Sequence, residues 1–417
     1  MIGKPIDSPW LYESAGPRSG WVAACITFLL ATSSIVFIEP APYDLIAIAL
    51  LGLLLVNGHR FSRDLQMPVL LLGCFVAGNM LAATVSDDPA ATVRSLSIRL
   101  YMGLTWLLLV SVVLVDPYRM LKAIWLGYMV AAVIATLWGG LEYLGVLPGE
   151  QWQGGLRAKG PFKDPNVYGP FLVPAAIYAL SQILGQPWRR IIIYFSLFLL
   201  FVLGILLSFS RGAWMNFAVS FMLFSSITVW TATAHRQRIT WLLAGTVICA
   251  IVAFAIVAAV STDVVGDRFF QRATLVQKYD TAEGGRFDTQ LEALAMVGRN
   301  PLGVGPGRSD DAFGLEPHNL YLHSLTEGGW LAGLGLLGFL AWHMLNGLGA
   351  VSRRWPLRPQ ATVILACTAG TLLQSFFIDS THWRHLWLLL ALLGAISLSE
   401  RRDRRETQLG LMSKSRF

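Results

Sequence analysis

The stretch "RRIIIYFSLFLLFVLGILLSFSRGAW", Arg189 to Trp214, decides the fold class of this chain. Between its leading arginines and Arg211 lies an almost unbroken apolar run of about 20 residues, the length a helix needs to cross the hydrocarbon core of a bilayer. A helix is expected because lipid cannot hydrogen-bond an exposed backbone. The stretch therefore predicts a membrane-spanning helix that ends in a tight turn carrying Arg211.

The same pattern recurs along the whole chain. Of its 417 residues, 55% are hydrophobic and only 14% are charged, which is too apolar for a soluble domain. We expect an all-α polytopic membrane protein, one integral membrane domain over residues 1–417, with about twelve transmembrane helices. The expected spans are approximately 21–38, 43–57, 67–84, 95–115, 120–147, 168–184, 189–209, 213–232, 240–260, 319–346, 361–380 and 383–399.

The distribution of basic residues predicts the orientation. Alternate loops and the C-terminal tail carry more than half of the 32 Lys and Arg residues, and by the positive-inside rule that side faces the cytoplasm. Both termini then lie in the cytoplasm, including a basic tail at about 400–417. This accounts for much of the net charge of +7 without a nucleic-acid partner. We expect the first span to remain as an anchor, because a long polar segment precedes it.

The opposite side carries the two longest loops. One is a medium loop at about 148–167, and the other is a large loop at about 261–318, between the ninth and tenth spans. The four cysteines lie inside apolar runs without disulfide or zinc spacing, so we interpret them as core residues.

Basic residues on this outer side need an explanation. Arg211 lies in the tight turn "SFSRGAW", and an arginine at the membrane boundary indicates either function or pairing with lipid headgroups. The medium loop gathers Arg157, Lys159 and Lys163, which would suit an anionic group with several oxygens. In the same loop, Asp164 and Asn166 are either part of a site or ordinary helix-capping residues.

The large loop contains an expected amphipathic helix of about 12 residues. Phe287, Leu291, Leu294 and Val297 recur at helical spacing. Arg286 falls at its N-terminal end, where free backbone N–H groups and the helix dipole attract anions; a solvated helix-end residue is the alternative. The following "GVGPG" lacks the spacing of a nucleotide-binding loop, and we interpret it as a tight turn.

Two histidines mark the boundary between the large loop and the tenth span. His318 follows Pro317 at the water boundary, where a neutral imidazole can accept a proton; an interfacial capping role is the alternative. His323 lies deeper and is expected to be a packed or pore-facing ring. Five residues along a helix separate the two rings by roughly 140°, so we expect no metal site. Asn319 is a candidate hydrogen-bonding residue next to His318, either supporting the site or contacting an acceptor.

A further outer turn, "IDSTHWRHLW", contains Asp379, His382 and Arg384. Asp379 could orient a histidine or bind a sugar hydroxyl, and an ordinary turn is an equally good interpretation.

These motifs resemble those of the O-antigen ligase and polymerase superfamily. The resemblance rests on "GGRFDTQLEALAMVGRNPLGVGPG" with "EPHNLYLHSLTEGGWLAGLGLLGFL", supported by "RAKGPFKDPNVYG" and "SFSRGAW". It implies a GT-C type glycosyltransferase of the bacterial inner membrane, with its active site facing the periplasm and no cofactor. By motif position, His318 would be catalytic, and Arg211 and Arg286 would bind diphosphate. Arg157 and Lys163 match less tightly.

The resemblance also implies the substrates. Such an enzyme moves a glycan from undecaprenyl diphosphate onto an acceptor, which for a ligase is lipid A–core. The motifs leave three alternatives open: a ligase, a polymerase or protein oligosaccharyltransferase of the same superfamily, and a non-enzymatic transporter of lipid-linked glycan. The transporter predicts charges deep in several spans, whereas most ionisable residues lie near span ends.

Overall fold

The computed structural model describes residues 18–38, 40–147, 151–152, 155–183, 186–233, 235, 238–240, 245–246, 285–309, 311 and 317–414. This part of the chain is mainly helical. Its longer elements are α1 (Arg18–Ala31), α2 (Pro42–Val56), α3 (Gln66–Ala82), α4 (Pro89–Val115), α5 (Pro117–Tyr143), α6 (Pro165–Ser181), α7 (Trp188–Leu207), α8 (Arg211–Thr231), α12 (Arg286–Arg299), α14 (Leu320–Ser352), α15 (Arg358–Gln374) and α16 (Arg384–Lys414).

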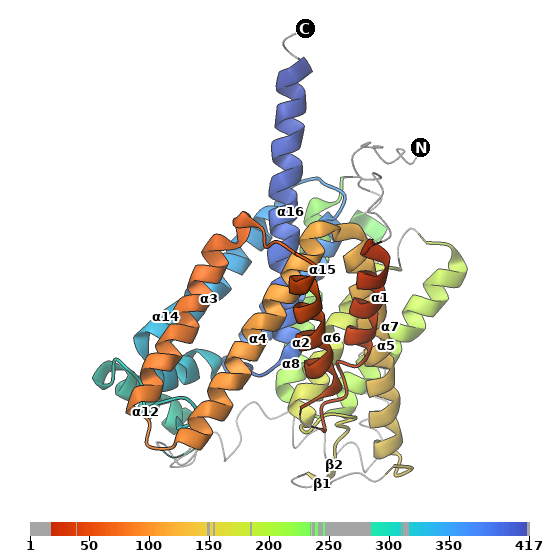
Figure 1. Cartoon of the computed structure of the whole chain (residues 1–417). Helices are drawn as coiled ribbons and strands as arrows, with labels where there is room; N and C mark the ends of the chain where they lie inside the picture. The colour runs from red at the N-terminus through yellow and green to blue at the C-terminus, as the bar shows by residue number, and fades with distance from the viewer. Residues whose placement is uncertain are drawn as a thin grey trace.

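Short elements link the helices. The 3₁₀ turns η2 (Arg63–Leu65) and η3 (Ala83–Val85) flank α3, and a small antiparallel ladder joins β1 (Gln151–Trp152) to β2 (Gly155–Leu156). The helices form a bundle from which the end of α16 projects, while α12 and the ladder lie at the opposite end (Figure 1). We call these the tail end and the α12 end.

The helices are apolar enough for a bilayer. Within the described residues, six have the length and composition of membrane spans: 63–85, α4, α5, α7, α8 and α14. This is consistent with a polytopic membrane protein. Eleven of the predicted spans overlap a helix. The ninth, at about 240–260, falls mostly outside the described residues, so the count of twelve stays a prediction.

Several helix ends differ from the predicted edges: α1 ends at Ala31 and α15 at Gln374, both before the predicted edges, whereas others extend beyond them. α4 begins at Pro89, earlier than the apolar run, because the Asp88 carboxylate caps it by accepting bonds from the N–H groups of Ala90 and Ala91, both at 3.0 Å. α14 continues to Ser352, beyond the predicted edge. Apolar length alone does not contain a capping signal such as Asp88.

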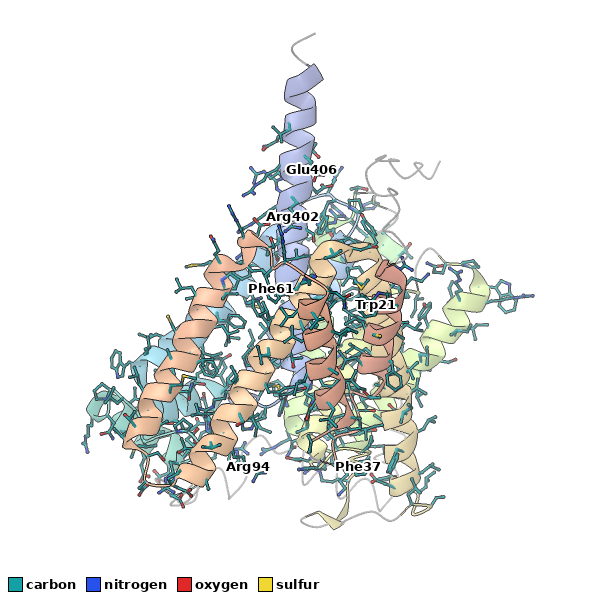
Figure 2. All side chains as sticks on the ribbon, in the orientation of Figure 1. Trp21, Phe37, Phe61, Arg94, Arg402 and Glu406 are labelled. Atoms are coloured by element: carbon teal, nitrogen blue, oxygen red, sulfur yellow. The ribbon has the colours of Figure 1, made fainter. Side chains whose placement is uncertain are left out.

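The loops gather at two ends, as alternating connections require. At the tail end, the Arg402 guanidinium donates to Asp64 Oδ2 at 2.9 Å and to the Leu114 carbonyl at 3.3 Å. These bonds connect α16 to η2 and to the end of α4. At the α12 end, Val36 N–H donates to the Pro161 carbonyl at 3.1 Å. Figure 2 shows Arg402 and Phe61 at the first end, and Arg94 and Phe37 at the second.

Candidate functional site

The turn between α7 and α8 places Arg211 at the α12 end. α7 stops at Leu207 and α8 begins at Arg211, with Ser210 Oγ accepting the Ala213 N–H at 3.4 Å. Phe209 in this turn has a φ of 46°, a left-handed conformation that costs a non-glycine residue energy. The sharp turn starts α8 with a half-buried arginine at the bundle end.

The medium loop folds onto this same turn. Arg157 Nε donates to the Ser208 carbonyl at 2.8 Å, and its terminal nitrogen donates to Asn166 Oδ1 at 3.0 Å. Ala158 N–H donates to the Leu207 carbonyl at 3.0 Å. The sequence patterns at 157–166 and 208–211, far apart in the chain, are therefore neighbours.

A buried carboxylate holds the rest of that loop. Glu142, at the end of α5, accepts the Gly160 N–H at 2.8 Å and the Lys159 N–H at 3.4 Å. The Lys159 side chain is half-buried and that of Lys163 is exposed. Asp164 accepts the Asn166 N–H at 2.8 Å and caps α6, so its capping interpretation is what the structure shows.

His318 stands immediately before α14 in a strained conformation. Its φ is 46°, and it and Phe209 are the positive-φ residues other than glycine in the described part of the chain. The cap of α14 is Asn319, whose Oδ1 accepts the N–H groups of Tyr321 and Leu322 at 3.0 and 3.1 Å. His318 is thus not the capping residue. Phe209 lies in the "SFSRGAW" motif, and His318 lies in the motif that begins "EPHNLYLHSL".

The neighbours of His318 are fixed by hydrogen bonds. Gln290 Nε2, one turn after Arg286 on α12, donates to the Pro317 carbonyl at 3.1 Å. Leu320 N–H donates to the Ser375 carbonyl at 2.9 Å. Asn319 Nδ2 donates to the Phe376 carbonyl at 3.2 Å. These bonds place the start of α14 and the first turn of α12 at the end of α15.

The end of α15 also receives the start of α8. Asn216 Nδ2 donates to Gln374 Oε1 at 2.9 Å, and a Cβ added at Gly212 would lie 2.7 Å from Gln374 Nε2. A side chain at Gly212 would therefore require the Gln374 side chain to move. The first turns of α8, α12 and α14, which begin at or just after Arg211, Arg286 and His318, therefore all contact residues 374–376, and the Arg157 loop adjoins the α7–α8 turn.

α12 itself differs in one respect from the predicted stripe. The helix forms, and its packed face is Thr289, Ala293 and Val297, whose carbonyl accepts Trp330 Nε1–H at 2.9 Å. The other three members of the predicted apolar stripe are exposed: Phe287, Leu291 and Leu294. A small-residue face allows close packing on α14, while the larger apolar residues point away from the protein.

The turn at 375–383 brings a carboxylate, Asp379, close to His323, whereas the α7–α8 turn carries Arg211. Asp379 Oδ2 lies 3.7 Å from His323 Nε2, and its Oδ1 accepts the Thr381 N–H at 3.0 Å. Burial opposes ionisation of Asp379, but the nearby imidazoles of His323 and His382 and the bonds from Thr381 outweigh it and lower the carboxyl pKa. The His382 side chain is exposed.

Arg384 is engaged in an ion pair between helices. Its Nε and a terminal nitrogen donate to the two oxygens of Asp44 on α2, both at 2.7 Å, and Tyr101 O–H donates to Asp44 Oδ1 at 2.7 Å. This bidentate pair engages one edge of the guanidinium with Asp44.

We expect Arg384→Met to lower thermal stability, because it leaves the largely buried Asp44 carboxylate without its cation. Breaking such a pair typically costs about 3–5 kcal/mol. The double variant Asp44→Asn/Arg384→Met should recover most of the loss. Melting in detergent, followed by fluorescence, measures both; equal melting temperatures for wild type and Arg384→Met would contradict a stabilising role.

A buried charged cluster was missed by the sequence reasoning. Arg99 on α4 forms an ion pair with Glu327 on α14, and a terminal nitrogen of Arg99 lies 3.3 Å from His323 Nε2. His323 is therefore among charged groups and is more than a packed ring. The i,i+4 spacing of His323 and Glu327, and the lone charge inside the fourth span, were signals for it.

Comparison with known protein families supports the resemblance that the sequence motifs indicated. Residues 195–337, about a third of the chain, match the family model described as O-Antigen ligase. The match supports assignment of the chain to the O-antigen ligase and polymerase (Wzy-like) superfamily. It covers Arg211, α12 and His318, so the match and the convergence of these elements fall on the same region. No curated protein matches the chain.

Proposed function

We propose that the protein is an O-antigen ligase that transfers a glycan from undecaprenyl diphosphate to a sugar hydroxyl of lipid A–core. One observation carries the proposal: within the described residues, the two non-glycine residues with positive φ, Phe209 and His318, lie just before the starts of α8 and α14, which meet at the end of α15. Strain of this kind persists where the surrounding structure over-determines it, and it is concentrated at functional sites.

The chemistry would be a single displacement at the anomeric carbon. The acceptor oxygen forms a bond to that carbon as the bond to the diphosphate oxygen breaks, and undecaprenyl diphosphate leaves. His318 accepts the acceptor hydroxyl proton, which is typically worth about 10²–10⁴ in rate. A single displacement inverts the configuration at the sugar carbon.

The cations would stabilise the leaving group. Arg211 and Arg286 carry the developing diphosphate charge, with Arg157, Lys159 and Lys163 on the medium-loop side. Arginine suits this task because its planar guanidinium binds phosphate oxygens bidentately. Asn166 already orients Arg157, and Asn319 caps the helix behind His318.

We place this site on the periplasmic side of the bacterial inner membrane, in a GT-C type fold with about twelve spans and cytoplasmic termini. The tail end carries arginines on α16 and at residues 353–358, as expected of a cytoplasmic face. The exposed Phe287, Leu291 and Leu294 of α12 then face the outer lipid surface.

Because arginine supplies the positive charge, we expect transfer to continue in EDTA. The measurement is the initial rate in proteoliposomes with and without chelator. Loss of activity that magnesium restores would contradict this metal-independent mechanism.

The ligase is separated from its alternatives by product analysis. Purified protein in proteoliposomes is given undecaprenyl-diphosphate glycan with lipid A–core. Glycan on lipid A–core supports the ligase. Longer glycan on the carrier would instead indicate a polymerase, modified protein an oligosaccharyltransferase, and glycan moved across the membrane without a new bond a transporter.

A further inference from the structure

α14 is a broken helix. Gly329 has φ 67° and ψ −171°, so the helix divides into a first segment, Leu320–Gly328, and a second that begins at Trp330. A break leaves carbonyl and N–H groups without partners inside the helix, and burying them unpaired would be costly. The first segment begins just after His318, so whatever closes the break fixes the far end of the segment whose near end is held by Ser375 and Phe376.

Residues 301–305 close the break. Val304 N–H donates to the Thr326 carbonyl at 2.8 Å, Gly305 N–H to the Glu327 carbonyl at 3.1 Å, and Trp330 N–H to the Pro301 carbonyl at 2.9 Å. This segment therefore pairs groups on both sides of the break. The "GVGPG" turn is part of this connection. We call residues 301–309, which bridge the two parts of α14, the splice.

Glycine is required at the contact itself. A Cβ at Gly303 would lie 2.5 Å from the Glu327 carbonyl oxygen, and a Cβ at Gly329 would lie 2.4 Å from the Pro301 carbonyl oxygen. Both residues also have left-handed φ angles, 80° and 67°. Backbone meets backbone here, so neither neighbour can move aside as a side chain would.

The Glu327 side chain holds the rest of the splice. Its Oε2 accepts the Gly307 N–H at 2.9 Å, and its Oε1 accepts the Ser309 N–H at 3.2 Å and the Ser309 O–H at 2.9 Å. The carboxylate is 1% exposed. Two loop amides, the Ser309 hydroxyl and Arg99, rather than solvent, therefore satisfy the carboxylate.

Arg99 supplies the charge that this buried carboxylate needs. It is 2% exposed, pairs with Glu327 and donates to Asn79 Oδ1 on α3. Removing one member of a buried pair leaves an uncompensated charge, which is far more costly than replacing both. The pair joins α3, α4, the first segment of α14 and the splice at one point.

We propose that Glu327 and Arg99 are positioning residues: they lock the splice onto the break in α14 and so help to fix the first segment, which begins two residues after His318. The first segment has about nine residues, so the lock acts about 13 Å along the helix from His318. The catalytic consequence rests on the proposed function, whereas the lock itself does not.

Hydrogen–deuterium exchange of the full-length protein tests the lock without any activity assay. In Glu327→Gln, we expect amides in 303–309 and 320–327 to exchange about tenfold faster or more, since bonds to a charged acceptor are lost. Peptides of α15 and of the tail end should exchange as in wild type. Unchanged exchange in 303–309 would overturn the proposal.

A matched control lies in the second segment of the same helix. His343 is fully buried and accepts Trp106 Nε1–H at 3.1 Å, so His343→Gln also disturbs a buried hydrogen bond. It should lower thermal stability without accelerating exchange in 303–309. Faster exchange there in His343→Gln as well would show general loosening and would overturn the proposal.

Activity distinguishes positioning from simple stability. For folded Glu327→Gln we expect kcat to fall about 10²-fold, as a misplacement of about 1 Å can cause, with the donor KM nearly unchanged. Arg99→Lys keeps the charge and should retain more activity than Arg99→Met. The double variant Arg99→Met/Glu327→Met should regain stability but not kcat.

The two proposals can fail separately. If wild-type protein transfers no glycan, the proposed function fails, and the exchange experiment still decides whether the lock exists. If exchange rises as expected but kcat of the variants stays at the wild-type value, the lock exists and its catalytic role is overturned. Should Glu327→Gln not insert, the comparison of Arg99→Lys with wild type carries both readouts.

Discussion

His318→Ala is expected to lower kcat for glycan transfer by about 10²–10⁴ while the protein stays folded and inserted. The alanine removes the group that accepts the hydroxyl proton. The hydrogen bonds of Pro317, Asn319 and Leu320, which fix the start of α14, belong to neighbouring residues and remain. The loss should therefore appear in rate and not in melting temperature.

His235 provides the matched control. It is an exposed histidine four residues after the end of α8, beyond the opposite end of that helix from Arg211. His235→Ala should transfer glycan at the wild-type rate. Full activity in His318→Ala would remove His318 from the mechanism, whatever the result for His235.

Arg211→Ala is expected to lower kcat by about 10²–10³, the typical loss when one donor to a developing anion is removed. Arg211→Lys should restore only part of it, because an ammonium group keeps the charge but cannot bind two oxygens in one plane. Initial rates at saturating donor, measured in proteoliposomes, give the comparison.

Arg189 is the control for charge alone. It lies at the opposite end of α7, where its guanidinium is 5.7 Å from the centre of the Trp188 ring. Arg189→Ala removes the same charge from the same helical hairpin and should leave kcat unchanged. Equal losses in the two alanine variants would mean that Arg211 acts through insertion or net charge, which would contradict a role at the diphosphate.

Membrane helices were readily predicted because one property, apolar length, nearly suffices to identify them. The apolar run after Arg189 became α7, and the run after Arg211 became α8. Helix ends were less accurate, since caps such as Asp88 extend a helix beyond its apolar stretch. The ninth span and most of the large loop lie outside the described residues, so those predictions stay untested.

The candidate residues could be picked from the sequence, but their arrangement could not. An arginine where the positive-inside rule disfavours it is a local signal, and it marked Arg211 and Arg157. That Arg157 bonds the Ser208 carbonyl depends on how α6, α7 and α8 pack. Arg384 carried the same local signal and is paired with Asp44 instead.

The Arg99–Glu327 pair shows why pairing across distant segments is hard to foresee. The two residues are 228 positions apart, and only folding brings α4 against the broken α14. Arg99 was visible as a charge within a predicted span, and Glu327 follows His323 by one helical turn. Neither position alone identifies the other, nor does "GVGPG" reveal that it closes a helix break.

The stoichiometry of one turnover tests directly whether the protein transfers glycan from undecaprenyl diphosphate to lipid A–core. Purified wild-type protein in proteoliposomes, with undecaprenyl-diphosphate glycan and lipid A–core, should release one undecaprenyl diphosphate for each glycan joined to acceptor, as a displacement at the anomeric carbon requires. Mass spectrometry of the lipid fraction measures both products. Glycan that crosses the membrane while still attached to its carrier, with no undecaprenyl diphosphate released, would contradict the account.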